Sequence, residues 1–236
     1  AVTKDHQLVV SHEPYMGAHI CLDSLGNEIA KEDELTHNIY QMSYDQVASY
    51  DVGTKKHDRF PEQQKMKVAK PLLHDLVHAV EDYEMTHKRK PVRYNIEIKS
   101  DPRGDTIFHP TPAVYSKLVY DFLTTHMDLS LVNVQSFDFR VLQYFHEHYP
   151  EVELAALVEN EHSIDENLSS LGFSPEIYSC YFPMLDSQKV AYLQSKEIKV
   201  IPWTVNDPAD ISEMIKIGVD GIISDYPNRV FEEISK

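Results

Sequence analysis

Cysteines, basic residues and long apolar runs are scarce in this chain. Its 236 residues include only 2 cysteines, Cys21 and Cys180, too few for a disulfide framework or a thiolate metal site. The sequence also has no phosphate-cradling Gly-rich loop, no Gly-x-Ser-x-Gly elbow and no His-Glu-x-x-His pattern. The signatures of several common enzyme classes are therefore missing. The two cysteines leave room for one disulfide at most.

The charge balance is acidic, with 22 Lys and Arg residues against 38 Asp and Glu residues and a net charge of −16. Nucleic acids and anionic membranes attract basic surfaces, so we expect neither as a partner. No apolar run approaches the length of a membrane span, and residues 1–11 lack the basic start and apolar core of a signal peptide. The composition suits one globular domain, 1–236, with a sizeable core.

Apolar, β-prone runs recur along the second half of the chain, with helical patterns between them. The predicted strands are 92–99, 130–137, 153–158, 178–184, 199–205 and 221–225. The clearest predicted helices are 70–88, 111–126, 138–148, 187–195 and 208–217. Asp207 and Pro208 are typical of a helix start, and Gly218 is typical of a residue just past a helix end.

Short, regular strand–helix alternation predicts parallel strands joined by right-handed crossovers. An open doubly wound sheet and a closed barrel both fit, and the lack of a dinucleotide fingerprint favours the barrel. We therefore predict an α/β fold, a (β/α)8 TIM barrel. The N-terminal part adds one short strand, Leu8–Ser11, and residues 15–69 read as an inserted loop at the active-site rim, with some helix at 43–50. A complete barrel has eight strands, so the strand count predicts that about two N-terminal βα units lie outside the sequence as given.

The run 92–99 alternates with period two, so Tyr94 and Ile96 point to one face while Glu97 and Lys99 point to the other. Most strands among βα units are covered on both faces and read as continuous apolar runs. An acid beside a base on such a strand suits a metal ion and a phosphate. An internal ion pair or a solvated face is the other interpretation.

Five segments, in order along the chain, resemble motifs of one known family. They are Thr3-Lys4-Asp5 with Leu8–Pro14, Asn95–Lys99, Val134–Phe137, Pro202–Asn206 and Gly218–Pro227. Together they resemble the glycerophosphodiester phosphodiesterases, whose fold is the (β/α)8 barrel. The family's His-Arg-Gly, Glu-Asn-Thr and Glu-x-Asp motifs have no counterpart here, and by register they would fall before Ala1. Glu13 stands where the family usually has Asp.

The resemblance implies metal-dependent hydrolysis of a glycerophosphodiester to glycerol phosphate and an alcohol. In that pattern Glu97 is a ligand of a divalent cation, Mg²⁺ or Ca²⁺. Lys99 neutralises charge on the phosphate, and His12 is the general acid or base on the bridging oxygen. The implied partner is a small-molecule diester.

Three further side chains each have two candidate roles. Gln135 is expected to bind substrate or water, or to be a satisfied core amide. Trp203, the single tryptophan, is expected to offer an apolar wall to the substrate, or to pack in the core. Asp225 is expected to bind a substrate hydroxyl or to cap the helix that follows it, and we favour the cap.

Two other functions stay open on the sequence. One is a lyase-type phospholipase D of the related toxin family, which cyclises its substrate's headgroup. The long stretch 15–69 argues against the lyase, because those toxins carry a short loop at that position. The other is a non-catalytic module, if the protein begins at Ala1 and has only half of the family's site.

Overall fold

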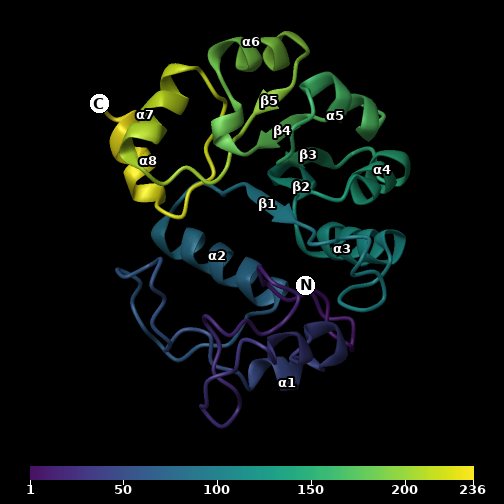
Figure 1. Cartoon of the computed structure of the whole chain (residues 1–236), viewed down its shortest axis with the longest axis vertical. Coiled ribbons are helices and arrows are strands. Elements are labelled where there is room, and N and C mark those ends of the chain that lie inside the picture. Colours follow the sequence, from purple (N-terminus) through teal and green to yellow (C-terminus); the bar gives the residue numbers. More distant parts are fainter. The chain divides into compact units, whose positions relative to one another are not determined.

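The computed structural model describes residues 1–236 and divides them into two compact units. The first unit comprises Ala1–Arg93 and Ile98–Leu131, and the second comprises Tyr94–Glu97 and Val132–Lys236. Figure 1 traces the elements in chain order, from purple to yellow. Every helix is too short or too polar to cross a bilayer.

The second unit is built on a parallel sheet whose strand order equals the chain order. The strands are β1 (Tyr94–Glu97), β2 (Val132–Ser136), β3 (Glu153–Val158), β4 (Ile177–Cys180) and β5 (Lys199–Val200). Each strand pairs with the next in parallel register. Sequential parallel strands joined by helices are the arrangement of a barrel wall.

Helices follow the strands, and Figure 1 shows α4 to α7 in an arc around them. They are α4 (Phe139–His148), α5 (Ile164–Leu171), α6 (Ser187–Ser195), α7 (Pro208–Lys216) and α8 (Pro227–Ile234). The side chains of Asp138, Ser163, Asp186 and Asp207 each accept a backbone N–H at a helix start. Gly218, at φ +83° just past α7, confirms the predicted helix end.

Alternate residues of each strand point to opposite faces of the sheet. On one face Val158, Tyr178 and Cys180 pack in a buried cluster with Val190 and Leu193 of α6. The strand register places Asn95, Glu97, Asn133, Gln135 and Ser179 on the opposite face, which we call the polar face. The predicted alternation along 94–97 is therefore confirmed.

Three predicted strands differ from the structure. The run 221–225 forms no strand, although Val205 N–H donates to Ile223 O and Ile223 N–H donates to Pro202 O, at 2.9 Å each. Run 199–205 forms a strand only at its first two residues, although Ile201 N–H and Trp203 N–H still donate to Tyr178 O and Cys180 O beyond its end. The run 178–184 ends its strand at Cys180, since Phe182–Met184, with its proline, turns into a short 3₁₀ helix, η4.

The predicted barrel strand Leu8–Ser11 is wrong. Leu8 and Val9 instead make isolated antiparallel bridges with Val2 and Leu72 in the first unit. The helices α5 and α8 were not singled out, because each has only 8 residues and too few turns for a clear apolar stripe.

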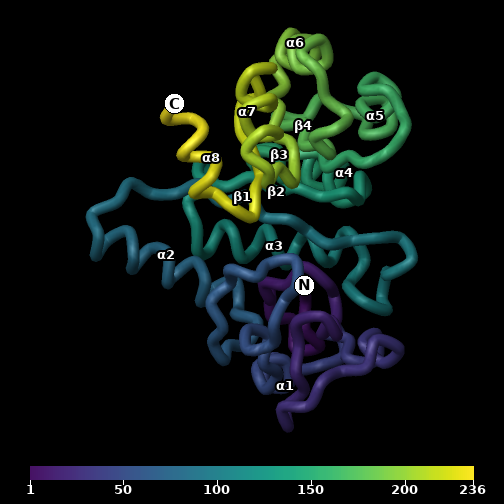
Figure 2. Tube along the Cα trace, turned by 60° about the vertical axis from the view of Figure 1, so that its left-hand side comes forward, coloured from purple at the N-terminus to yellow at the C-terminus, as the bar shows by residue number.

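The first unit contains α2 (Leu73–His87) and α3 (Pro112–His126), which confirm two predicted helices. Its other helical segments are η1 (Glu34–Thr36), η2 (Ile39–Gln41), α1 (Tyr44–Ala48) and η3 (Leu129–Leu131). Figure 2 shows residues 15–69 as loops on either side of α1, in purple and blue. These loops have a core of their own around Met16, Cys21 and Ile39. Their place at an active-site rim stays a prediction, as do the single barrel domain and the two additional βα units.

Burial of α4 against the sheet gives a test of the second unit. Phe145 is fully buried, and we expect Phe145→Ala to lower the free energy of unfolding by about 3–5 kcal/mol, because it leaves a cavity. Phe231→Ala on α8 is the matched control, since Phe231 is 70% exposed. Urea denaturation measures both, and equal losses in the two variants would contradict this packing.

Candidate functional site

His12 is held between an acid and a base in the first unit. Its Nδ1 lies 2.8 Å from Glu13 Oε1, and its Nε2 lies 3.5 Å from Lys99 Nζ. A carboxylate only accepts and an ammonium group only donates, so these partners favour a proton on Nδ1 and leave Nε2 as the acceptor side of the ring. The His12 side chain is 78% exposed, which leaves this nitrogen pair within reach of a solute.

Beneath this pair lies a buried lysine. Lys70 is 4% exposed, and its Nζ donates to Ser11 Oγ at 2.6 Å. Ser11 Oγ in turn donates to the backbone oxygen of Glu13 at 2.5 Å. The hydrogen bond from His12, assisted by the charges of His12, His19 and Lys70, lowers the pKa of Glu13 to about 2. Burial lowers the pKa of Lys70.

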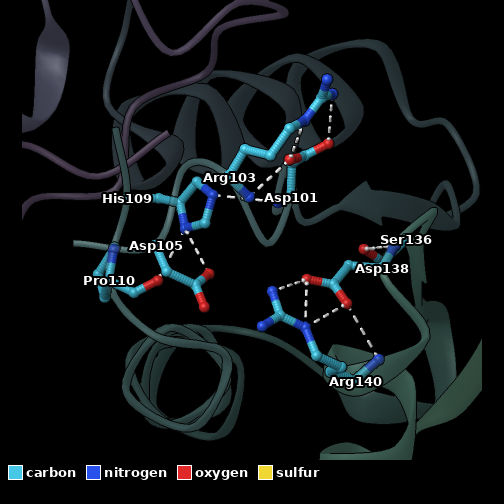
Figure 3. Close-up of polar contacts among 8 residues, drawn as sticks. All are labelled: Asp101, Arg103, Asp105, His109, Pro110, Ser136, Asp138 and Arg140. Atoms are coloured by element: carbon cyan, nitrogen blue, oxygen red, sulfur yellow. Dashed lines mark hydrogen bonds and ion pairs between the residues drawn. The ribbon is translucent and has the colours of Figure 1, made fainter. Parts of the chain in front are cut away.

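The loop after Lys99 is fixed by a buried histidine (Figure 3). His109 Nδ1 donates to Pro110 O at 2.8 Å, and its Nε2 accepts the Asp101 N–H at 3.0 Å. Any Cβ at Gly104 would lie 2.6 Å from His109 Nε2, so the loop needs glycine there. Arg103 pairs with the Asp101 carboxylate at 2.9 Å and holds its pKa at about 2.

The second unit presents side-chain oxygens on the polar face of its sheet. Glu97, the last residue of β1, pairs in register with Gln135 of β2, so their side chains are neighbours on this face. Gln135 is 8% exposed, and its Oε1 has no hydrogen-bond partner. Such a buried, orphaned oxygen implies a missing partner.

These oxygens suit a hard divalent cation in kind. Mg²⁺ commonly takes one or two carboxylates and fills its other positions with water and substrate phosphate. Glu97 and Gln135 together match the protein share of such a set. No three His, Cys, Asp or Glu side chains are grouped closely enough to hold a metal ion, so the described residues supply only part of a coordination sphere.

Trp203 stands in an aromatic group at the carboxyl ends of the strands. Its ring centroid lies 5.3 Å from that of Phe137 and 5.7 Å from that of Tyr181. The indole Nε1 donates to Ser179 O at 2.9 Å, which fixes the ring. Phe137 is 43% exposed and Tyr181 38%, so the group presents an apolar surface to solvent rather than lying in the core.

Asp225 does not cap the helix that follows, so that prediction is wrong. Helix α8 begins after Tyr226 without a side-chain cap, and Asp225 instead accepts from Asn206 Nδ2 at 2.9 Å. The carboxylate is therefore committed to the preceding loop. By contrast, Asp138 caps α4, pairs with Arg140 at 2.7 Å, and donates its N–H to Ser136 Oγ (Figure 3).

Sequence comparison identifies the family. The sequence profile of the Glycerophosphoryl diester phosphodiesterase family matches residues 1–229. The chain belongs to this family of phosphoric diester hydrolases. A glycerophosphodiester phosphodiesterase of Bacillus altitudinis is 24% identical over 233 residues, which are 97% of this chain and 81% of the relative. The enzyme of that name from Caldanaerobacter subterraneus is 25% identical, over 100% of this chain and 83% of its own length.

Solved structures of the family share the fold. One is a Silicibacter pomeroyi protein described as a glycerophosphoryl diester phosphodiesterase, which superposes with a TM-score of 0.86 at 24% sequence identity. The superposition covers 100% of this chain and 81% of the Silicibacter chain. An Oleispira antarctica phosphodiesterase in complex with the product sn-glycerol-3-phosphate gives a TM-score of 0.74 at 19% identity, covering 100% and 82%. These likenesses confirm the α/β, TIM-barrel-like fold.

Several contacts in this family member were not predicted. The sequence alone gave no role to Lys70 or Ser11, because residue 70 is far from the motif in sequence and no pattern marks a buried lysine. Phe137 could have been found, since it is two residues after Gln135 and a strand returns to one face every second residue. Tyr181 had the same signal relative to Ser179.

The His12–Glu13 pair makes a pH-dependent contribution to stability. Folding lowers the pKa of Glu13 from 4.5 to about 2, so its contribution is present above about pH 4.5 and is lost as pH falls toward 2. We expect Glu13→Gln to destabilise the protein near neutral pH, with a difference from wild type that shrinks below pH 4.5.

Urea denaturation between pH 2 and 6 measures this difference. Glu32→Gln is the control, because Glu32 is exposed and neither accepts a hydrogen bond nor forms an ion pair. A Glu13→Gln curve that stays parallel to wild type over the whole range would contradict the assignment.

Proposed function

We propose that this chain hydrolyses glycerophosphodiesters to sn-glycerol 3-phosphate and an alcohol. The observation that carries the proposal is the placement of His12, whose Nδ1 lies beside Glu13 and whose Nε2 lies beside Lys99. Membership of the phosphodiesterase family supports it. The Oleispira antarctica phosphodiesterase, which shares the fold, is described in complex with the product sn-glycerol-3-phosphate.

His12 acts as the general acid and base in this proposal. Glu13 binds Nδ1–H, so Nε2 is the nitrogen that takes a proton from, or returns it to, an oxygen at the phosphorus. Imidazole suits the task because its unperturbed pKa lies near neutrality. The Lys99 ammonium group stabilises the negative charge that grows on the phosphate oxygens in the transition state.

A divalent cation, Mg²⁺ or Ca²⁺, would be held by Glu97, with the orphaned Gln135 Oε1 beside it. When bound, it would supply Lewis-acid polarisation of the phosphate. Gln135 can also serve the substrate role predicted for it, because an amide that binds a cation or a water through Oε1 keeps its Nε2 hydrogens free to donate to the substrate.

Trp203, with Phe137 and Tyr181, forms an apolar wall for the carbon atoms of the glycerol or the alcohol. Aromatic surfaces bury such groups without donating or accepting hydrogen bonds. The acidic chain, at −16, favours soluble diesters over an anionic lipid surface.

Removing His12 tests the catalytic assignment. We expect His12→Ala to lower kcat for release of glycerol phosphate roughly 10²–10⁴-fold, the range that a general acid or base contributes. His87→Gln is the control, because His87 is exposed and donates only to the backbone of its own helix. A coupled enzyme assay with glycerol-3-phosphate dehydrogenase follows the product.

The assay also separates the alternatives. An unchanged kcat in His12→Ala would contradict the role of His12, and an accumulating cyclic phosphate would indicate the lyase reaction of the toxin family. If no glycerophosphodiester were cleaved with either Mg²⁺ or Ca²⁺ present, the proposed function itself would fail.

Glu97→Gln tests the cation assignment. We expect the Mg²⁺ concentration for half-maximal activity to rise at least about tenfold, since even an outer-shell partner of a metal ligand contributes that much. Glu176→Gln is the control. Glu176 accepts a hydrogen bond from the backbone N–H of Leu154 at the amino-terminal end of β3, which is the end opposite to Glu97 on β1. Metal titrations that coincide for wild type and Glu97→Gln would exclude Glu97 as a ligand.

A further inference from the structure

Lys70 is a buried charge without a carboxylate partner. Its side chain is almost inaccessible, and the ammonium group donates to the neutral hydroxyl of Ser11 rather than to an acid. Burying an ammonium group is costly unless it is paired and hydrogen-bonded. Burial accordingly lowers the pKa of Lys70, while the nearby Glu13 charge acts to raise it. The buried Lys70 ammonium group therefore calls for a functional or structural explanation.

The segment that carries Lys70 is attached directly to the segment that carries His12. Val10 N–H donates to Pro71 O at 2.9 Å, and Leu73 N–H donates to Leu8 O at 2.8 Å. Val9 forms an antiparallel bridge with Leu72 between these two bonds. The backbone of residues 70–73 therefore supports residues 8–10, and the Lys70 side chain extends that support to the turn that follows.

A relay of two hydrogen bonds then runs from Lys70 to the Ser11–Glu13 turn, which contains His12. Lys70 Nζ donates to Ser11 Oγ, and Ser11 Oγ donates to the backbone oxygen of Glu13. The relay pins both ends of the Ser11–Glu13 turn, so the Glu13 carboxylate is presented to His12 Nδ1. The Lys70 charge also favours the ionised form of Glu13, which is the form that accepts the imidazole proton.

We propose that Lys70 is a positioning residue, which acts through Ser11 and Glu13 to hold His12 in the Nδ1–H tautomer with Nε2 directed to the reaction. The inference rests on the proposed function for its kinetic consequences. Lys70 itself touches no reacting atom. The groups that face His12 and Glu13 in this unit are Lys99, His19 and Lys70, and none of them is a second acid that could replace Glu13.

Two variants break the relay at different points. Lys70→Met keeps the length of the side chain and removes the ammonium group, and Ser11→Ala removes the connecting hydroxyl. We expect each to lower kcat roughly 10–100-fold with little change in KM, a loss of the size seen when supporting partners of functional groups are removed. Ser11→Thr retains a hydroxyl and should keep most of the wild-type kcat.

Lys55→Met is the matched control. Lys55 is also largely buried in the first unit, at 20% side-chain exposure; it donates to Ala18 O at 2.6 Å and lies 3.4 Å from Glu28 Oε2. It has no hydrogen bond to the Ser11–Glu13 turn, so its loss should change stability without changing kcat. Thermal unfolding of all four variants separates effects on folding from effects on positioning.

The tautomer of His12 gives a readout that does not need activity. In a ¹⁵N NMR spectrum of histidine side chains at mildly alkaline pH, with His12 assigned from its loss in His12→Gln, wild type should show the Nδ1–H form. Lys70→Met and Ser11→Ala should shift His12 toward the Nε2–H form, and Lys55→Met should not. If the wild-type enzyme cleaved no diester, this spectrum would still test the relay.

The inference is overturned if Lys70→Met and Ser11→Ala both keep the wild-type kcat and His12 tautomer. It is equally overturned if they change only KM, or if Lys55→Met loses kcat to the same extent. Covalent labelling of Ser11 by a fluorophosphonate would also overturn it, because Lys70 would then be the activating base of a nucleophilic serine rather than a support for His12.

Discussion

The parallel register of the second unit's sheet is the constraint on which the rest of that unit depends. Once Tyr178, Cys180 and Val158 are committed to the helices on one face, every alternate residue must face the other way. That alternation puts Glu97 beside Gln135 and continues to Phe137 and Trp203 where the strands end. A shift by one residue would exchange the polar face for the apolar one.

In the first unit the corresponding element is a short antiparallel ladder between residues 8–10 and 71–73. It ends where His12 begins to face solvent, so the side chains on either side of it determine how the imidazole is held. Glu13 supplies the negative charge and Ser11 the connection to Lys70. The replacement of the family's usual Asp by Glu keeps a carboxylate at 2.8 Å from Nδ1, which explains why the longer side chain is compatible with the proposed role.

Much of this could be predicted from the sequence because the relevant forces are local. The α6 helix matches its predicted bounds, 187–195, and α7 begins at the predicted Asp207 cap. Glu97 was placed on the right face by period-two alternation alone. The roles of His12, Glu97, Lys99, Gln135 and Trp203 came from family resemblance, and they stay predictions.

What sequence reasoning missed depends on contacts that are distant along the chain. Leu8–Ser11 looked like a barrel strand because its residues are β-prone, but its partner is Leu72 in antiparallel orientation. Strand β5 is shorter than its apolar run, and beyond it only single backbone hydrogen bonds from Ile201 and Trp203 reach β4. Asp225 was expected to cap the following helix, but the N–H group that its carboxylate accepts from is Asn206 Nδ2, 19 residues away along the chain. Lys70 carries no local signal at all.

The central claim is that the chain cleaves a phosphodiester with water at phosphorus. Its most direct test is hydrolysis of glycerophosphoethanolamine in ¹⁸O-labelled water with Mg²⁺ or Ca²⁺, followed by mass spectrometry of both products. Hydrolysis at phosphorus predicts one ¹⁸O atom in the sn-glycerol 3-phosphate and none in the alcohol. Recovery of unchanged diester, label in the alcohol, or a cyclic phosphate as the final product would contradict it.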